Sequence, residues 1–227
     1  MCSVDLRTVT RLAAKLPKRP LVVSLNPASL QDVLDSLSEI GKAVGLEAAA
    51  AEARADLDRR IAASTREVAN DAARPNVLFM EWPEPIFVGG HWTPQLIHNA
   101  GGVQRIHPLV GKKSFAVKDE DVARDDADVI VAAGCGLNLE TVQRVLVDVE
   151  AHPVRGPWWR SLRAVREGRV YLADGSLMFN RPSHHLVAAQ EWMSWVLDAP
   201  LEVRAADRRD TADPRCAEFP WRPYVGS

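Results

Sequence analysis

The sequence has few cysteines, no long apolar run and no dominant charge. Its three cysteines, Cys2, Cys135 and Cys216, lie far apart, so they predict neither a disulfide framework nor a CxxC metal site. No run of about eighteen apolar residues occurs, so we expect no transmembrane helix. The net charge of −2 comes without a basic block, which argues against nucleic acid as a partner because phosphate binding needs a basic surface.

Signal and catalytic patterns are missing as well. The first residues do not show a basic and then apolar signal peptide, so the chain as written is expected to be cytoplasmic. It contains no GxSxG, no HExxH, no glycine-rich phosphate loop with a lysine, and no GxGxxG after a strand. These absences argue against an enzyme, and nothing in the sequence predicts a resident cofactor or metal ion.

The pattern of apolar residues predicts an α/β fold. The chain has 227 residues, of which 47% are hydrophobic and 26% charged, which is typical of a globular protein with a substantial core. A helix is expected over 5–16 and a strand over Leu21–Leu25. Two helical stretches follow, from about Leu30 to Val44, where Gly45 is a natural helix end, and from about Glu47 to Ala72. Together they give some forty residues of helix. Strands and helices then alternate, with strands at 77–80, 128–133 and 168–172 and a last helix over 182–197. This order predicts a mostly parallel sheet flanked by helices.

An aromatic loop follows the first of these later strands. We expect ligands at this place, because open α/β sheets bind them at the carboxyl ends of their strands. Aromatic faces beside a polar group suit a flat organic ligand. The candidate residues in this loop are Glu81, Trp82, Phe87, Gly90, His91 and Trp92.

Two more loops, Gly134–Asn138 and Asp174–Arg181, follow the other strands and are expected at the same edge. Their candidate ligand-binding residues are Cys135, Gly136, Phe179, Asn180 and Arg181. Each aromatic residue has packing as its alternative, and Asn180 and Arg181 could cap the last helix. Cys135 fits a nucleophile or metal ligand, or a small side chain filling a tight turn. An α/β enzyme that uses Cys135 or His91 on a small metabolite is therefore the alternative function.

Several motifs resemble one known family. The residues Glu81-Trp82, Phe87-Val88, Gly90-His91-Trp92 and Ala100-Gly101-Gly102 are similar to cobalamin-binding-type substrate-binding proteins of ABC transporters. These belong to the class III, helical-backbone periplasmic binding proteins, which also take iron siderophores and haem. The strings Asp128-Val129-Ile130-Val131, Gly168-Arg169-Val170-Tyr171 and Phe179-Asn180-Arg181-Pro182 resemble the same family.

The resemblance implies two α/β lobes joined by a long backbone helix, with a ligand held in the cleft between them and no chemical turnover. Residues 1–29 would be a remnant of the N-terminal lobe, 30–73 the backbone helix, 74–200 the C-terminal lobe and 201–227 a flexible tail. It implies cobalamin or another corrinoid or tetrapyrrole as the ligand and an ABC transporter permease as a partner. Members of the family are usually extracytoplasmic.

The sequence departs from this family at its start, where a full member has most of another lobe. Half of the ligand cleft is therefore expected to be missing. Three explanations stay open: a start assigned too late, a truncated remnant that only mediates interactions, or a second copy that supplies the missing surface in a homodimer.

Overall fold

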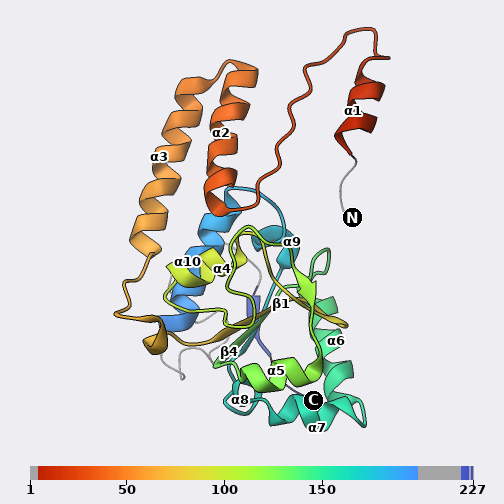
Figure 1. Cartoon of the computed structure of the whole chain (residues 1–227), viewed down its shortest axis with the longest axis vertical. Helices are drawn as coiled ribbons and strands as arrows, with labels where there is room; N and C mark the ends of the chain where they lie inside the picture. The colour runs from red at the N-terminus through yellow and green to blue at the C-terminus, as the bar shows by residue number, and fades with distance from the viewer. Residues whose placement is uncertain (1–4, 199–220, 225, 227) are drawn as a thin grey trace.

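The computed structural model describes residues 5–198, 221–224 and 226 of the chain (Figure 1). An α/β lobe lies below two upright helices, and an N-terminal helix stands apart at the end of an extended segment. The helices are α1 (Leu6–Ala13), α2 (Leu30–Val44), α3 (Glu47–Ser64), α4 (Thr93–Asn99), α5 (Asp119–Asp125), α6 (Leu139–Ala151), α7 (Arg155–Ser161), α8 (Arg163–Arg166), α9 (Gly175–Met178) and α10 (His185–Asp198), with a 3₁₀ turn, η1, at Asp71–Ala73.

A single six-stranded sheet forms the centre of the lobe. Its strands are β1 (Val77–Pro83), β2 (Ile86–Val88), β3 (Phe115–Ala116), β4 (Val129–Ala132), β5 (Val170–Ala173) and β6 (Trp221–Pro223), in the order β3-β2-β1-β4-β5-β6. The neighbours β1, β4 and β5 run parallel, while β2, β3 and β6 add antiparallel edges. The predicted fold class, a mostly parallel sheet flanked by helices, is confirmed, and the antiparallel edges are an addition to it.

Alternate residues of the central strands face opposite sides of the sheet. Val77 and Phe79 of β1 pack with α2, α3, α4 and α10, whereas Leu78 and Met80 pack with α5, α6, α7 and α8. This two-sided burial explains why the central strands are apolar without interruption, as parallel strands between two helical layers are.

The stretch predicted as one long backbone helix, 30–73, is two helices that fold back on each other. Gly45 ends α2 in the left-handed region at φ 72°, a conformation that suits glycine, and α3 then runs antiparallel beside α2 (Figure 1). The two helical stretches and the end of the first at Gly45 were predicted correctly, but a single long backbone helix over 30–73 does not form, and the second helix ends at Ser64 and not near Ala72. Glycine ends the first helix, and the alanine-rich second helix returns along it.

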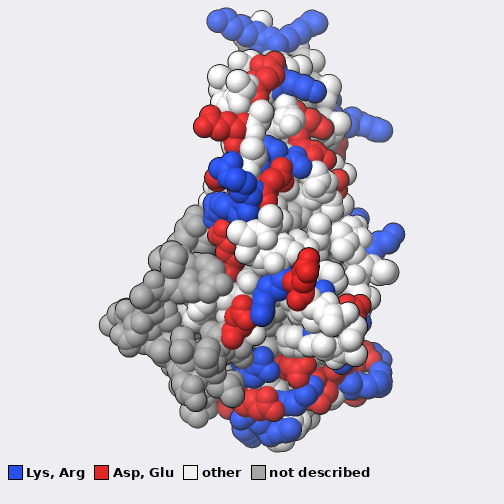
Figure 2. Space-filling model, turned by 90° about the vertical axis from the view of Figure 1, so that its left-hand side faces the viewer, with Lys and Arg blue, Asp and Glu red and all other residues white. Residues whose placement is uncertain are grey.

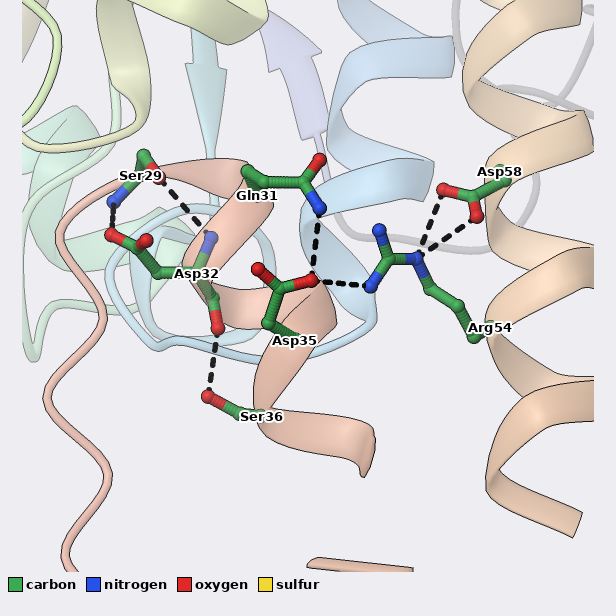
Figure 3. A network of polar contacts seen from close by, with 7 residues as sticks. All are labelled: Ser29, Gln31, Asp32, Asp35, Ser36, Arg54 and Asp58. Carbon is green, nitrogen blue, oxygen red and sulfur yellow. Dashed lines mark hydrogen bonds and ion pairs between the residues drawn. The ribbon is translucent and has the colours of Figure 1, made fainter. Parts of the chain in front are cut away.

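Polar contacts hold this helical hairpin together (Figure 3). Ser29 caps α2 through a reciprocal capping box with Asp32. Arg54 on α3 donates to Asp35 on α2 at 2.7 Å and to Asp58 on its own helix at 2.9 Å. The guanidinium of Arg54 lowers the pKa of Asp35, because a hydrogen bond to the ionised carboxylate favours that form.

Charged groups of both signs are interspersed along the outer face of the molecule. Figure 2 shows lysines and arginines beside aspartates and glutamates from the top of the upright helices to the bottom of the lobe. This face offers no extended area of a single charge. None of the described helices is both long and apolar enough to cross a membrane.

The predicted strand Leu21–Leu25 does not form. The segment between α1 and α2 is extended and exposed, with Leu21 75% exposed, and it has no strand partner among the described residues. Its β-branched residues have the composition of a buried strand, but a strand needs a neighbour to satisfy its backbone groups. The helix predicted over 5–16 forms as α1.

The predicted flexible tail, 201–227, contains a strand. β6 pairs with β5, and Trp221 is buried with its ring centroid 5.0 Å from that of Trp195. The prediction of a flexible tail is wrong for these residues, because apolar packing on α10 holds them. The rest of that prediction over 199–220, together with Cys2 and Cys216, lies outside the described residues.

Candidate functional site

The three predicted strand-exit loops lie at one edge of the sheet and are bonded to one another. The amide of Cys135 donates to the carbonyl of Glu81 at 3.0 Å, which joins the exits of β4 and β1. The Asn180 side-chain amide donates to the carbonyl of Ala133 at 2.9 Å, which joins the exits of β5 and β4. The amide of Gly136 lies 3.2 Å from Ser176 Oγ, its acceptor. The backbones of the three loops therefore meet at one edge of the sheet, whereas the predicted convergence of their side chains holds for only some of them.

Gly175 lets the second and third loops approach this closely. A Cβ atom there would lie 2.3 Å from Asn180 Nδ2 and 2.5 Å and 2.6 Å from the carbonyl oxygens of Ala133 and Gly134. Two of these atoms belong to the backbone and cannot rotate away. Glycine at this position is therefore a condition for the contact between the loops.

A cleft of about 560 Å³ opens over these loops, and the segment before α2 forms its other wall. Its lining residues are Leu25, Asn26, Pro27, Cys135, Gly136, Ser176, Asn180, Arg181 and Pro182. The structure thus brings together four predicted site residues: Cys135, Gly136, Asn180 and Arg181. The volume is within the range of small-molecule sites.

Ser176 and Leu25–Pro27 line the cleft but were not predicted from the sequence as site residues. Ser176 lies within the loop Asp174–Arg181, so its place in that loop was the available signal. Leu25–Pro27 gave no such signal, because this segment meets the loops only in three dimensions.

Arg181 gives the cleft its charge. It is exposed at the entry to α10, lines the cleft, and makes no ion pair with any residue of the described part of the chain. No aspartate or glutamate is among the lining residues. The cleft therefore presents an uncompensated guanidinium, which can bind a carboxylate or another planar anion through two parallel hydrogen bonds.

Two of the predicted aromatic residues belong to the core and not to the cleft. Trp92 is 8% exposed, and its indole N–H donates to the carbonyl of Phe179 at 2.7 Å. Phe179 is 1% exposed, with its ring centroid 4.8 Å from that of Phe79. The expectation that these two rings lie open at the sheet edge is wrong, because packing between α4, α10 and β1 buries them.

Three other predicted residues hold a neighbouring loop. Glu81 accepts a short hydrogen bond from the Ser114 hydroxyl, which in turn accepts from the amide of Gly90 at 3.1 Å. His91 has a positive φ of 53°, and its amide donates to the carbonyl of Lys112 at 2.5 Å. None of the three lines the cleft of Arg181. Their role in ligand binding stays a prediction.

Trp82 and Phe87 face each other across the β1–β2 hairpin, in what was predicted to be a loop. Both are partly exposed. Trp82 lines a second hollow, on the side of α6, and is absent from the lining of the cleft. A role of Phe87 in binding stays a prediction.

The sequence profile of one family, described as "Periplasmic binding protein", matches residues 10–177, about three quarters of the chain. The chain belongs to this periplasmic binding protein family.

Solved periplasmic binding proteins share the fold. An ABC transporter substrate-binding protein from Listeria monocytogenes superposes with a TM-score of 0.65 at 22% identity, covering 78% of this chain and 67% of that protein. A periplasmic heme-binding protein from Roseiflexus superposes with a TM-score of 0.66 at 19% identity, covering 86% and 72%. A protein of an Fe3+-hydroxamate transport system from Saccharomonospora viridis gives 0.59 at 21%, covering 78% and 59%.

These similarities establish the fold of the periplasmic binding protein lobe. The chain spans 59–72% of the length of the three solved proteins. No match was found among curated proteins. The family and the solved neighbours consist of substrate-binding transport proteins and not of enzymes.

Proposed function

We propose that this chain binds an organic iron complex that presents carboxylate or hydroxamate oxygens, of the haem or ferric hydroxamate kind, for an extracytoplasmic ABC importer. The ligand occupies the cleft between the strand-exit loops and Leu25–Pro27. Membership of the periplasmic binding protein family supports solute binding and delivery to a permease.

The observation that carries the ligand class is the uncompensated charge of Arg181. A cleft with one free guanidinium and no acidic lining residue attracts anions and disfavours cations. Around Arg181, Asn180 and Gly136 add neutral polar groups, and Leu25 and Pro27 add apolar surface. This combination suits an organic ring system or chelate that carries carboxylate or hydroxamate oxygens.

The named ligands of structural neighbours point the same way. One neighbour belongs to an Fe3+-hydroxamate transport system, one is a heme-binding protein, and a third from S. aureus was solved with heme. Cobalamin, the ligand implied by the sequence motifs, carries mostly neutral amide arms and makes less use of a free arginine. Iron complexes with oxygen-rich edges therefore fit the cleft better than cobalamin does.

Calorimetric titration with haem, a ferric hydroxamate and cyanocobalamin tests this proposal. We expect an iron ligand to bind more tightly than cyanocobalamin. Arg181→Gln should weaken that binding about 10- to 100-fold, since a charged hydrogen bond is worth roughly 1.5–3 kcal/mol. Arg144→Gln is the matched control, because Arg144 is an exposed arginine of α6 that does not line the cleft. Tighter binding of cyanocobalamin, or equal losses in both variants, would contradict the proposal.

A further inference from the structure

A second hollow, separate from the cleft, lies between the β1–β2 hairpin and α6. Its volume is about 500 Å³, and none of its lining residues is shared with the cleft. The lining residues are Trp82, Pro83, Glu84, Leu137, Val145, Asp148, Val149, His152 and Arg155. One wall is apolar and comes from Trp82 and the valines of α6, and the other is charged.

Internal bonds fix the charged wall. The Arg155 guanidinium donates to both carboxylate oxygens of Asp119 at 2.8 Å and forms an ion pair with Glu84. It also lies 5.4 Å from the centre of the Trp158 ring. The positive charge of Arg155 is therefore already neutralised by two carboxylates and an aromatic face, and it is not available to bind an anion.

The Trp82 indole and the His152 imidazole are also held in place. The indole N–H donates to the carbonyl of Glu84 at 2.7 Å, which anchors the edge of a ring that lines the hollow. His152 Nδ1 accepts from the amides of Val154 and Arg155 at 3.2 Å and 3.1 Å. Because Nδ1 accepts these bonds, the proton of the neutral ring sits on Nε2.

Asp148 leaves the hollow with excess negative charge. It is exposed on α6 and makes no ion pair within the described part of the chain. Arg155 supplies one positive charge, whereas its partners Glu84 and Asp119 and the lining residue Asp148 supply three negative charges. An apolar wall with an indole face beside an unpaired carboxylate is the arrangement that binds an organic cation.

We propose that this hollow is a second binding site, for a small organic monocation that carries an aromatic or aliphatic body. The ammonium group lies beside Asp148, and the apolar body lies against Trp82, Val145 and Leu137. This site is independent of the proposed iron ligand, since the two sets of lining residues do not overlap and the two charges are opposite.

Phenethylamine and its neutral isostere phenethyl alcohol test the proposal by calorimetry or ligand-observed NMR on the full chain. We expect the amine to bind in the millimolar range or tighter and about fivefold or more tightly than the alcohol. Asp148→Asn is expected to remove most of that difference. Glu140→Gln, which deletes a negative charge on the same helix outside the hollow, is expected to keep it.

Three outcomes would overturn the proposal. One is equal binding of the amine and the alcohol, and another is the same loss in Asp148→Asn and Glu140→Gln. The third is that the unsubstituted chain, shown by circular dichroism to be folded, binds no amine at 10 mM. Haem or ferric hydroxamate binding is unaffected by any of these results, so the two proposals fail independently.

Discussion

Replacing Gly175 with alanine should separate the loops that form the cleft. The new Cβ would meet the Asn180 amide at 2.3 Å and the carbonyl oxygens of Ala133 and Gly134 at 2.5 Å and 2.6 Å. Overpacking of this kind costs about 1–3 kcal/mol. The hydrogen bond from Asn180 to Ala133, at 2.9 Å, would be lost with it and adds about 1 kcal/mol. We expect the free energy of unfolding to fall by about 2–4 kcal/mol.

Urea unfolding followed by tryptophan fluorescence measures this loss. With an m value of about 2–3 kcal/mol/M, the unfolding midpoint should fall by about 1 M. Gly136→Ala is the matched control in the same cleft, because no atom lies within 4 Å of its added Cβ and only its φ of 76° resists the change. That strain costs about 1–2 kcal/mol.

The comparison of the two variants decides whether the close approach matters. If Gly175→Ala is no less stable than Gly136→Ala, the crowding argument fails. The same holds if Gly175→Ala binds the cleft ligand as well as the unchanged protein does.

Two further predictions concern hydrogen bonds away from the cleft. Trp92→Phe should lower the free energy of unfolding, measured in urea, by about 1–3 kcal/mol, because it leaves the buried carbonyl of Phe179 without its donor. Trp82→Phe removes a similar hydrogen bond at an exposed carbonyl and should lower the free energy of unfolding by less. Equal losses in the two variants would contradict this prediction. Hydrogen bonds from the amide of Ala28 and from Ser29 lower the pKa of Asp32 in the folded protein. The ionised carboxylate therefore stabilises the fold at pH values above the unfolded pKa of about 3.9, and this stabilisation is lost as the pH falls towards the lower folded pKa. The free energy of unfolding, measured from pH 6 to pH 3, should therefore depend less on pH in Asp32→Asn than in the unchanged protein. The same pH dependence in both proteins would contradict this prediction.

The central sheet could be predicted from the sequence, because burial on both faces leaves a long apolar run in each strand. The run Val129–Ala132 needs no knowledge of its neighbours to be recognised. The edge strands could not be predicted in this way. β6 is three residues long and depends on Trp221 meeting Trp195 of α10, a contact that is remote in sequence.

The cleft was predictable in part for a related reason. Strand exits gather at one edge of any parallel sheet, so Cys135 and Arg181 could be assigned to the same place. Whether an aromatic ring stacks on a ligand or on its own core depends on burial, which the residue type does not reveal. Trp82 and Trp92 illustrate this, since only the second is buried.

The two walls of the cleft are held in the fold in different ways. Arg60 of α3 forms two hydrogen bonds, at 2.8 Å and 2.7 Å, with Glu191 of α10, and Gln190 donates to Ser64 at 2.9 Å. These bonds join α3 of the helical hairpin to α10, which packs on the sheet. The wall at Leu25–Pro27, in contrast, belongs to a segment without helix or strand. If the cleft opens or closes, we expect the segment before Ala28 to move and the loops around Arg181 to stay in place.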